Sequence, residues 1–555
     1  ILEAICGSQG LSNHDVTLRS RSCYLLTKLV KALRDRVAPY VDVIVPGMLD
    51  SRDGDGLDLS DEAKLNLYET IGYLVGMPSV PVRHLDGVLG PQIRRIAEML
   101  AAASALGGGE DDKDAAAAEL ATSVGAIANV SKGFKPAVTP EVEARFFQQA
   151  LEAATSGLMT FPRHMALRAK NMFLIHGLIP CLGEGLLRGL SLTTLLVLVQ
   201  EGDGKDLMEA TQLLNQLTIE YGPKAAELLD GALLPFARRM YQLMPGAGLT
   251  TAAINEPNAR GSANGMQYAL GTGVGPGVLS GGWPAITNGG QKPMDMGFPG
   301  GGGESGTAGG SQLLPHEMAE RSGILRLYLS VIQHLSSNGL AGVLSSPTNG
   351  PHLDGVLRFV LGGISGPEDA GTKKTCLYIF SLILGGFNRG RSGGSDADSG
   401  GGGAAKPSAM RTAGVPEGAG TAAQRRAPAG KGGGLWQGTG ATVDMEPAVR
   451  AAVTAFALEQ VVPAALRCLV DEAPVGLNLR DATALSAVVH MGGLLKEART
   501  ASGGSAGFVG AAALACNCTP QVAEQLQRAV ESAEDGPAIT SALKVYWGHI
   551  RQIEA

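Results

Sequence analysis

Hydrophobic residues recur along most of this chain at the three- and four-residue spacing of an amphipathic helix. In residues 15–37 the leucines follow one another at steps of four or seven, which places them on one stripe of a helix. These leucines are Leu18, Leu25, Leu29 and Leu33. At about 100° per residue, Lys31 lies opposite the stripe. The segment therefore predicts a helix with one apolar face and one basic face.

Similar helical segments follow in pairs with short breaks, and the alternating β-branched runs that would indicate strands are almost absent. A period of about 40–47 residues for two helices is typical of HEAT repeats. The sequence therefore predicts an all-α fold, an α-α superhelix (solenoid) of HEAT-type helical repeats. Further expected helices are one capped by Ser60 or Asp61, and residues 114–133, 138–157, 160–178, 180–200, 205–221, 224–244, 316–336, 352–363, 366–387, 446–470, 480–499, 518–533 and 537–554.

Two glycine-rich segments interrupt this pattern. Their composition buries too little apolar surface to offset the entropy of ordering, so we expect both to be disordered insertions. Their glycine clusters follow no predicted strand and lack the Gly-Lys-Ser/Thr ending of a phosphate-binding loop, which argues against a nucleotide site. The predicted layout is HEAT repeats at 1–245, a Gly-rich insertion at 246–312, HEAT repeats at 313–387, a Gly/Ala-rich insertion at 388–443 and C-terminal HEAT repeats at 444–555.

Composition and charge narrow the function classes. The formal net charge of −7 excludes a simple basic nucleic-acid binder but leaves room for local basic patches. Seven scattered cysteines do not suggest a disulfide framework, and reduced thiols favour the cytosol or nucleus. The most apolar stretch, Leu190 to Val199, is about half the length of a membrane span, so we expect no membrane segment. The chain starts at Ile1 within a helical pattern, which predicts part of a longer protein.

No convergent set of catalytic residues can be assembled from the sequence. The nine histidines are scattered, and neither a zinc-protease motif nor a nucleophile elbow occurs. Cys516 and Cys518 suit two small residues near a helix end better than a zinc site, because no second ligand pair lies nearby. The acidic run from Glu110 to Asp114 is typical of a solvated helix start. We therefore predict no enzymatic activity, no cofactor and no metal site.

Clustered basic residues are the best candidates for binding, because several phosphate contacts would give salt-dependent affinity despite the acidic total. The alternative interpretation of each cluster is a solvated outer face. Arg19 is a separate case, since Asp15 and Arg19 have the pattern of a structural ladder between HEAT repeats. The candidate phosphate contacts are Lys28, Lys31 and Arg34, then Arg163, Arg168 and Lys170, and finally Lys373 and Lys374.

Several segments of the sequence resemble segments of the exportin-T family and occur in that family's order. They cover most of the chain outside the two insertions, which the family generally lacks at this size. The first includes a spaced Arg-Ser-Arg, and the fourth a Lys-Thr-Cys. The segments are Leu18–Leu33, Leu59–Glu62 with Leu67–Gly72, Asp206–Glu209 with Leu213–Leu217, Lys374–Phe380, Val461–Ala464 with Leu477–Ala482, and Leu543–Trp547.

The resemblance implies a karyopherin of the importin-β superfamily, in its C-terminal portion. Such receptors carry tRNA from the nucleus through the nuclear pore as a complex with Ran-GTP, and release it in the cytoplasm after GTP hydrolysis. The implied partners are tRNA, Ran-GTP and nuclear pore proteins, and the implied protein shuttles between nucleus and cytoplasm. The family's main Ran-binding repeats lie N-terminal to the part that this chain resembles. The eight basic residues above are then candidate RNA-binding residues.

The physical chemistry of RNA is compatible with this reading. A-form RNA hides its base edges in a deep major groove, so a receptor for every tRNA should read shape, backbone and ends. A curved solenoid offers an extended concave surface for that purpose. The alternative is a HEAT-repeat scaffold or a transport receptor for protein cargo. A basic concave face would favour tRNA, and an acidic or apolar concave groove would favour protein.

Overall fold

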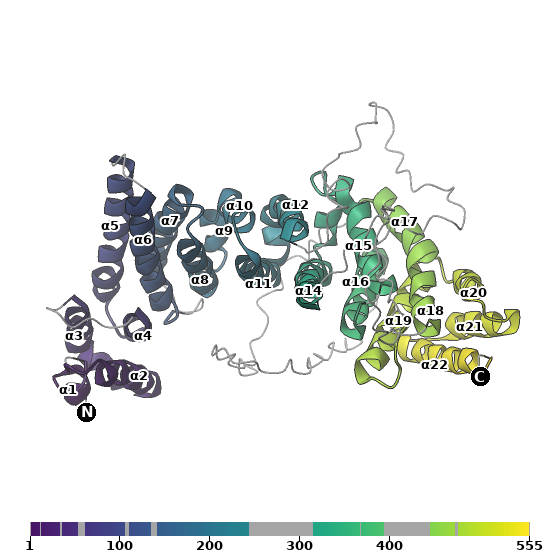
Figure 1. Ribbon diagram of the computed structural model, residues 1–555, viewed down its shortest axis with the longest axis horizontal. Helices are drawn as coiled ribbons and strands as arrows, with labels where there is room; N and C mark the ends of the chain where they lie inside the picture. The colour runs from purple at the N-terminus through teal and green to yellow at the C-terminus, as the bar shows by residue number, and fades with distance from the viewer. Residues whose placement is uncertain are drawn as a thin grey trace, which may run out of the picture.

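The computed structural model is a solenoid in which every described element of regular structure is a helix (Figure 1). Most helices are joined in antiparallel pairs, as expected of HEAT-type repeats. The predicted all-α class and α-α superhelix are therefore confirmed. The described residues are 2–11, 13–33, 36–53, 61–105, 110–134, 141–243, 315–366, 368–392, 445–471 and 476–553.

One row of helices runs along the inner side of the solenoid, and each member packs against the next. Figure 1 shows this row on the concave side of an arch whose two ends turn the same way. The inner row consists of α2 (Val16–Leu33), α4 (Asp61–Val75), α6 (Glu110–Ser131), α8 (Met165–Leu182), α11 (Gly204–Tyr221), α14 (Pro315–Ser337), α16 (Ala370–Ser392), α19 (Ala482–Ala501) and α22 (Gly536–Ile553).

A second row of helices covers the convex side (Figure 1). Short turns join the two rows: η2 (Ala38–Tyr40), η3 (Gly222–Ala225), η4 (Ala341–Ser345) and η5 (Gly350–His352). The outer row consists of α1 (Leu2–Cys6), α3 (Val41–Asp53), α5 (Arg83–Ala105), α7 (Glu141–Thr160), α9 (Gly185–Gly189), α10 (Leu192–Gln200), α12 (Ala226–Leu243), α15 (Leu353–Ser365), α17 (Pro447–Phe456), the π-helical turn η6 (Ala457–Val461), α18 (Val462–Val470), α20 (Gly507–Leu514) and α21 (Pro520–Ser532).

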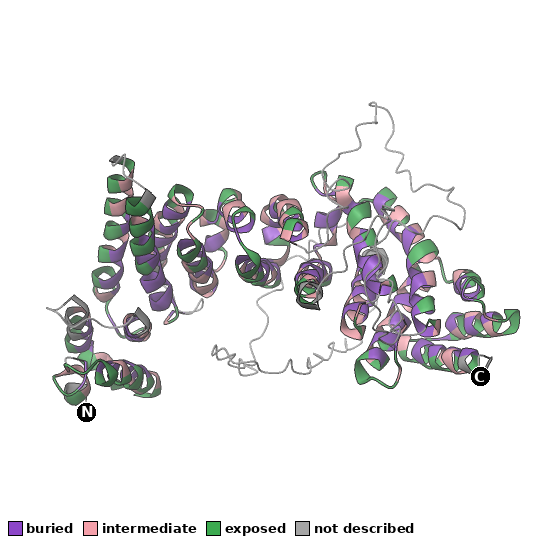
Figure 2. Cartoon of the chain, in the orientation of Figure 1, coloured by how far each residue is buried: buried purple, intermediate pink, exposed green. Residues whose placement is uncertain are grey.

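The buried face of α2 differs from the expected one. Buried residues gather where the two rows meet (Figure 2). On α2 they are Arg19, Ser22, Cys23, Leu26, Thr27 and Val30. The leucine stripe is instead exposed, with 43% of Leu18 and 54% of Leu25 accessible to solvent. The buried stripe escapes a hydrophobicity pattern because it contains polar groups satisfied internally, such as the Thr27 hydroxyl 2.6 Å from that of Thr70.

Prolines inside helices account for other differences from the expected boundaries. Helix α8 runs through Pro180 to Leu182, and the chain turns only at Gly183, where φ is 50°. The expected helix at 180–200 is therefore the end of α8 followed by the two shorter helices α9 and α10. Helix α5, which contains Pro91, was not among the expected helices, and neither was helix α20, which contains no proline.

The two predicted insertions lie largely outside the described residues. All of residues 246–312 falls outside them, so that prediction stays open. Helix α16 continues to Ser392, so residues 388–392 of the second predicted insertion are helical, while 393–443 lies outside the described residues.

One helix in the described part of the chain has the length and hydropathy of a membrane span. It is the continuous 24-residue helix Pro447–Val470, formed by α17, η6 and α18. It is longer than the apolar stretch Leu190 to Val199, much of which lies in α10. Half of the apolar window in Pro447–Val470 is buried inside the solenoid, where α18 packs against α15 and α20. This burial is the pattern of a core helix in a row of stacked repeats.

Two glycines allow α4 and α6 to approach closely. A Cβ atom on Gly133, in the turn after α6, would lie 1.9 Å from the carbonyl oxygen of Gly72 on α4. A Cβ atom on Gly72 would lie 2.2 Å from the carbonyl oxygen of Val130. Any larger residue would push the two helices apart. The close approach brings Lys132, the neighbour of Gly133, against α4.

Candidate functional site

An ionic network joins the inner helices α2 and α4 to the turn that follows α6. The ammonium group of Lys31 on α2 lies 2.5 Å from Glu69 Oε1 on α4. Lys132, directly after α6, donates to Glu69 Oε2 at 2.9 Å and to Asn129 Oδ1 at 2.9 Å. One carboxylate therefore holds two ammonium groups that are distant in sequence. We call Lys31, Glu69 and Lys132 the lysine bridge.

Aromatic rings support both lysines of this bridge. The Lys31 ammonium lies 4.5 Å from the centre of the Tyr73 ring on α4. The Lys132 ammonium lies 4.9 Å from the centre of the Phe173 ring on α8. Cation–π attraction at such distances helps to keep each ammonium group in place. The arrangement thus extends over four inner helices, from α2 to α8.

The lysine bridge carries surplus positive charge that faces solvent. It has two cations for one anion, and 24% of the Lys31 side chain and 34% of the Lys132 side chain are exposed. Burial alone would raise the pKa of Glu69, but hydrogen bonds from the two lysines outweigh it and hold the pKa below its ordinary value of 4.5. Glu69 is therefore ionised at neutral pH, and the ammonium groups keep fixed positions from which an anion can be bound.

Two further candidate lysines lie on the same inner helices. Lys28 on α2 is exposed, and its ammonium lies 5.2 Å from the centre of the exposed Tyr24 ring. Lys170 on α8 is half-buried, and its side chain passes close to Gly125 of α6. Both residues therefore belong to the same stretch of the inner row as the lysine bridge. Arg34 lies outside the described residues.

Arg168 has a structural role and not the predicted role in an RNA interface. Its residue is 4% exposed, and its Nε and Nη2 donate to Asp206 Oδ2 on α11 at 2.9 and 2.8 Å. A third bond from Nη1 reaches the carbonyl oxygen of Pro162 at 3.1 Å. A guanidinium group buried in these bonds cannot also reach an RNA phosphate, so the assignment of Arg168 to the interface is wrong.

Lys373 is likewise buried, with 1% of its surface exposed. Its ammonium donates to the carbonyl oxygen of Ile364 at 2.8 Å and also to that of Gly366. These carbonyls belong to the end of α15 and the loop after it. The ammonium therefore ties the two helices of one repeat together, and it does not face solvent. We remove Lys373 from the candidate interface as well.

A shared position explains both corrections. Arg168 and Lys373 are each the fourth residue after the first capping residue of an inner helix, His164 and Asp369 respectively. Arg19 occupies the same position after Asp15, is also buried, and donates to the carbonyl oxygens of the preceding loop, Asn13 at 2.8 Å and His14 at 3.0 Å.

The recurring position therefore carries a buried cation that satisfies loop carbonyls within the repeat. The burial of Arg19 agrees with a structural role, and its bonds to Asn13 and His14 lie within its own repeat; the expected ladder between repeats stays a prediction.

The remaining candidates face solvent to different degrees. Arg163 has 89% of its side chain exposed and lies 3.5 Å from Glu201. Lys374 is half-buried on α16. Burial and the nearby Lys374 charge lower the pKa of His490 on α19 to about 4, so this histidine is neutral at physiological pH. The positive charge of Lys374 is therefore not reinforced by its neighbour.

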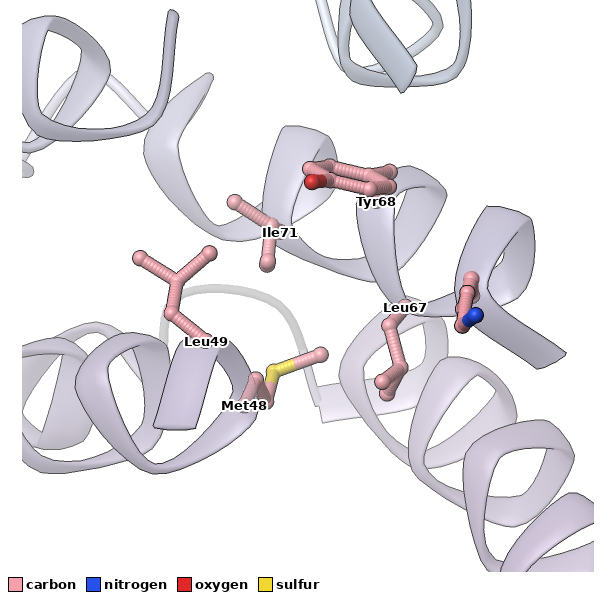
Figure 3. Close-up of a pocket in the computed structure, with 6 residues that line it drawn as sticks. Met48, Leu49, Leu67, Tyr68 and Ile71 are labelled. Atoms are coloured by element: carbon pink, nitrogen blue, oxygen red, sulfur yellow. The ribbon is translucent and has the colours of Figure 1, made fainter. Parts of the chain in front are cut away.

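A small apolar pocket between α3 and α4 is lined by Met48, Leu49, Leu67, Tyr68 and Ile71 (Figure 3) and by Lys64. It holds no more than about one water molecule. Among the residues described, no group of three or more histidine, cysteine or acidic side chains is placed to bind a metal. Among the described candidate residues, the lysine bridge is the cluster that the structure ties together directly.

Sequence comparison relates the chain to exportin-T. Residues 1–251 match the profile of the Exportin-T family. Exportin-T of Dictyostelium discoideum is 24% identical over 259 residues, which cover 44% of this chain and 24% of that protein. Exportin-T of Arabidopsis thaliana is 22% identical over 403 residues, covering 69% of this chain and 34% of that protein. The human exportin-T is 24% identical over 260 residues, covering 44% and 26%.

The matches leave most of each relative uncovered, since the chain spans about a quarter to a third of their length. Comparison of structures finds a chain described as importin 13 in its cytosolic state, with a TM-score of 0.50 and 11% identity, covering 100% of this chain and 47% of that one. At this identity the likeness concerns the fold alone. The predicted resemblance to exportin-T is confirmed.

Proposed function

We propose that this chain, which matches the Exportin-T family profile over residues 1–251, is part of a nuclear export receptor for tRNA. In this proposal the receptor binds tRNA together with Ran-GTP, passes through the nuclear pore by contacts with pore proteins, and shuttles between nucleus and cytoplasm. The activity belongs to a whole receptor several times the matched length. The part described here would supply a section of the concave surface around the RNA.

The observation that carries the proposal is the lysine bridge. It presents two fixed ammonium groups at consecutive members of the inner row of helices, and this row lines the concave side (Figure 1), where a curved solenoid would hold a large ligand. Phosphate contacts of this kind suit a receptor that accepts every tRNA, because they read the backbone and not the base sequence. The interface we propose contains Lys28, Lys31, Arg34, Lys132, Arg163, Lys170 and Lys374.

Alanine variants of Lys31 and Lys132 provide the central test of this interface. In the full-length receptor with Ran-GTP, Lys31→Ala and Lys132→Ala should each weaken all tRNAs to a similar degree. Each should also reduce the slope of log affinity against log salt by about one unit. Arg358→Ala is the matched control, since Arg358 is an exposed cation on outer helix α15, paired with Asp354. It should change neither the affinity nor the slope.

The outcome separates the interface from the fold. Both lysine variants must keep the wild-type melting temperature within a few degrees to count as informative. If they do, and affinity and slope stay at the wild-type values, the lysine bridge is not a tRNA contact. If the wild-type receptor with Ran-GTP binds no tRNA at all, the proposed function itself is wrong.

A receptor for protein cargo remains the second candidate, because exposed apolar side chains also occur on the inner row. On α11, 45% of Met208 and 53% of Ile219 is exposed. Met208→Ser and Ile219→Ser should leave tRNA affinity unchanged under the first proposal. Loss of a co-purifying protein partner in these variants, together with no RNA affinity in the wild type, would favour the protein-cargo reading.

A further inference from the structure

One aspartate on outer helix α12 binds the loop that precedes outer helix α15. Asp230 on α12 accepts hydrogen bonds from three side chains of the loop between η4 and η5. Thr348 Oγ1 donates to Oδ2 at 2.9 Å, Asn349 Nδ2 donates to Oδ1 at 2.7 Å, and the Ser346 hydroxyl donates to Oδ1. Asn349 is buried, with 4% of its surface exposed. We call these four residues the Asp230 joint.

Ser346 also shapes the loop that reaches Asp230. Its hydroxyl oxygen accepts from the backbone N–H of Asn349 at 3.1 Å, and its carbonyl oxygen accepts from the N–H of Gly350 at 2.6 Å. The residue is half-buried, whereas Pro347 and Thr348 are exposed. The hydroxyl thus lies at the edge of the joint and close to solvent.

The sequence around this hydroxyl fits one class of modifying enzyme. Ser346-Pro347 is the only Ser-Pro dipeptide in the chain. Serine followed by proline is the minimal pattern that proline-directed protein kinases recognise. Thr348 bonds to the same aspartate but is followed by Asn349, so it lacks this pattern.

We propose that Ser346 is a phosphorylation site for a proline-directed kinase and that its phosphorylation opens the Asp230 joint. The Ser346 oxygen attacks the γ-phosphorus of ATP, forming the ester bond as the bond to the β,γ-bridging oxygen breaks. ADP leaves, and the hydroxyl proton passes to the catalytic base of the kinase. The proposal does not depend on what the solenoid carries.

Phosphorylation reverses the electrostatics of the joint. In the unmodified protein the Ser346 hydroxyl donates a hydrogen bond to Asp230 Oδ1. A phosphoserine at that place lacks the donor and adds a charge of about −1.5 to −2 beside the carboxylate. Like charges at this separation repel strongly where solvent is partly excluded. The loop would leave Asp230, and Asn349 would lose its bonds to that residue.

A second proline-directed pattern in the described residues provides an internal control. Thr519-Pro520 begins α21, where Thr519 Oγ1 accepts from the N–H of Val522 at 3.4 Å. A phosphate at this helix N-terminus lies at the positive end of the helix dipole, which favours the added charge. Modification of Thr519 should therefore leave the fold undisturbed. Phosphate on Thr519 in the same sample also shows that the kinase is active on this protein.

The test treats the full chain with a cyclin-dependent kinase and ATP, then maps phosphate by peptide mass spectrometry. Phosphate is expected on Ser346 in the wild type and should be absent in Ser346→Ala and in Pro347→Ala. Pro347→Ala keeps the hydroxyl, so a wild-type melting temperature in this variant shows that the loss is one of recognition. Phosphate on Thr519 without phosphate on Ser346 would overturn the proposal.

Hydrogen exchange then tests the consequence for the joint. In phosphorylated protein, amides of α12 and of the loop at 346–352 should exchange about tenfold faster. The reason is that the side-chain hydrogen bonds between the loop and Asp230 are broken, so the loop no longer covers α12. Ser346→Ala without kinase removes one hydrogen bond but adds no charge, so it should produce a smaller increase. Equal exchange in phosphorylated and untreated protein would show that the joint stays closed, and the switch would be rejected.

Discussion

The inner face of α2, α4 and α6 and the inner face of α14 and α16 use their basic residues in opposite ways. In the first, Lys31 and Lys132 share a single carboxylate and keep part of each side chain in solvent. In the second, Arg326 is paired with Asp369 at 2.9 Å, and Lys373 is buried under loop carbonyls. The first face therefore presents positive charge to solvent. On the second face, these two cations are engaged in an ion pair and in bonds to backbone carbonyls.

The comparison shows that basic residues clustered in a helical repeat can have two distinct roles. Residues opposite the buried stripe of an inner helix can meet a ligand. The residue four positions after the cap points back under the loop, where it satisfies carbonyl groups. Adjacent lysines such as Lys373 and Lys374 can therefore differ completely in role. The following variants are arranged from the largest expected effect to the smallest.

The largest effect is expected at the buried ion pair. Arg168→Ala should lower the free energy of unfolding by about 3–5 kcal/mol, because it leaves the Asp206 carboxylate buried without its partner. Arg163→Ala, five residues away and exposed, should change it by less than about 0.5 kcal/mol. Denaturant titration measures both. Equal stability of the two variants would abolish the distinction between buried and presented cations.

The next comparison uses two neighbouring lysines. Lys373→Met should lower the free energy of unfolding by about 1–3 kcal/mol, since the carbonyls of Ile364 and Gly366 lose their donor. Lys374→Met should stay within about 0.5 kcal/mol of the wild type. A melting curve for each variant is sufficient. The reverse order of stability would show that the buried position tolerates a hydrophobic side chain.

The close approach of α4 and α6 should also be sensitive to size. Gly133→Ala should cost about 1–3 kcal/mol of unfolding free energy, because the added Cβ would overlap the Gly72 carbonyl. It should also weaken the bond between Lys132 and Glu69 by moving the turn. Gly87→Ala, inside α5 with no atom within 4 Å of the new Cβ, should instead stabilise by up to about 1 kcal/mol. Denaturant titration measures the free energy of unfolding of both variants. An unchanged value in Gly133→Ala would contradict the predicted overlap.

The smallest effect is the pH dependence of the lysine bridge. Because the pKa of Glu69 is lower in the folded protein than its ordinary value of 4.5, the folded state favours the ionised form. The stability that this contributes is fully present above the ordinary value and is lost as the pH falls through the lower folded pKa. Glu69→Gln should therefore narrow the stability gap between pH 6 and pH 3 by less than about 1 kcal/mol.

Urea titrations at several pH values measure the gap. An identical pH profile in the wild type and the glutamine variant would mean that the bridge adds no stability. The same variant gives a second reading in the binding assay, since it keeps the shape of the side chain while removing the negative charge between the two lysines.

The candidate site was only partly accessible from the sequence. Lys28 and Lys31 stood out as a cluster on one helix, and the structure keeps both at the surface or half-buried. Lys132 was missed because it is a single lysine in Ser-Lys-Gly, with no basic neighbour. Arg168 and Lys373 were misassigned although a signal existed. The spacing of Asp15 and Arg19, which had suggested a structural role, recurs between Asp369 and Lys373.

The sequence by itself determined the helices, their pairing and therefore the solenoid, because the three- and four-residue period of apolar positions is a local property. It also carried the likeness to exportin-T, which rests on the order of short segments. Only the tertiary structure decided which side of α2 is buried and which cations reach solvent. An inner helix has neighbours on more than one side, so its burial depends on segments distant in sequence, such as those that bring Glu69 between Lys31 and Lys132.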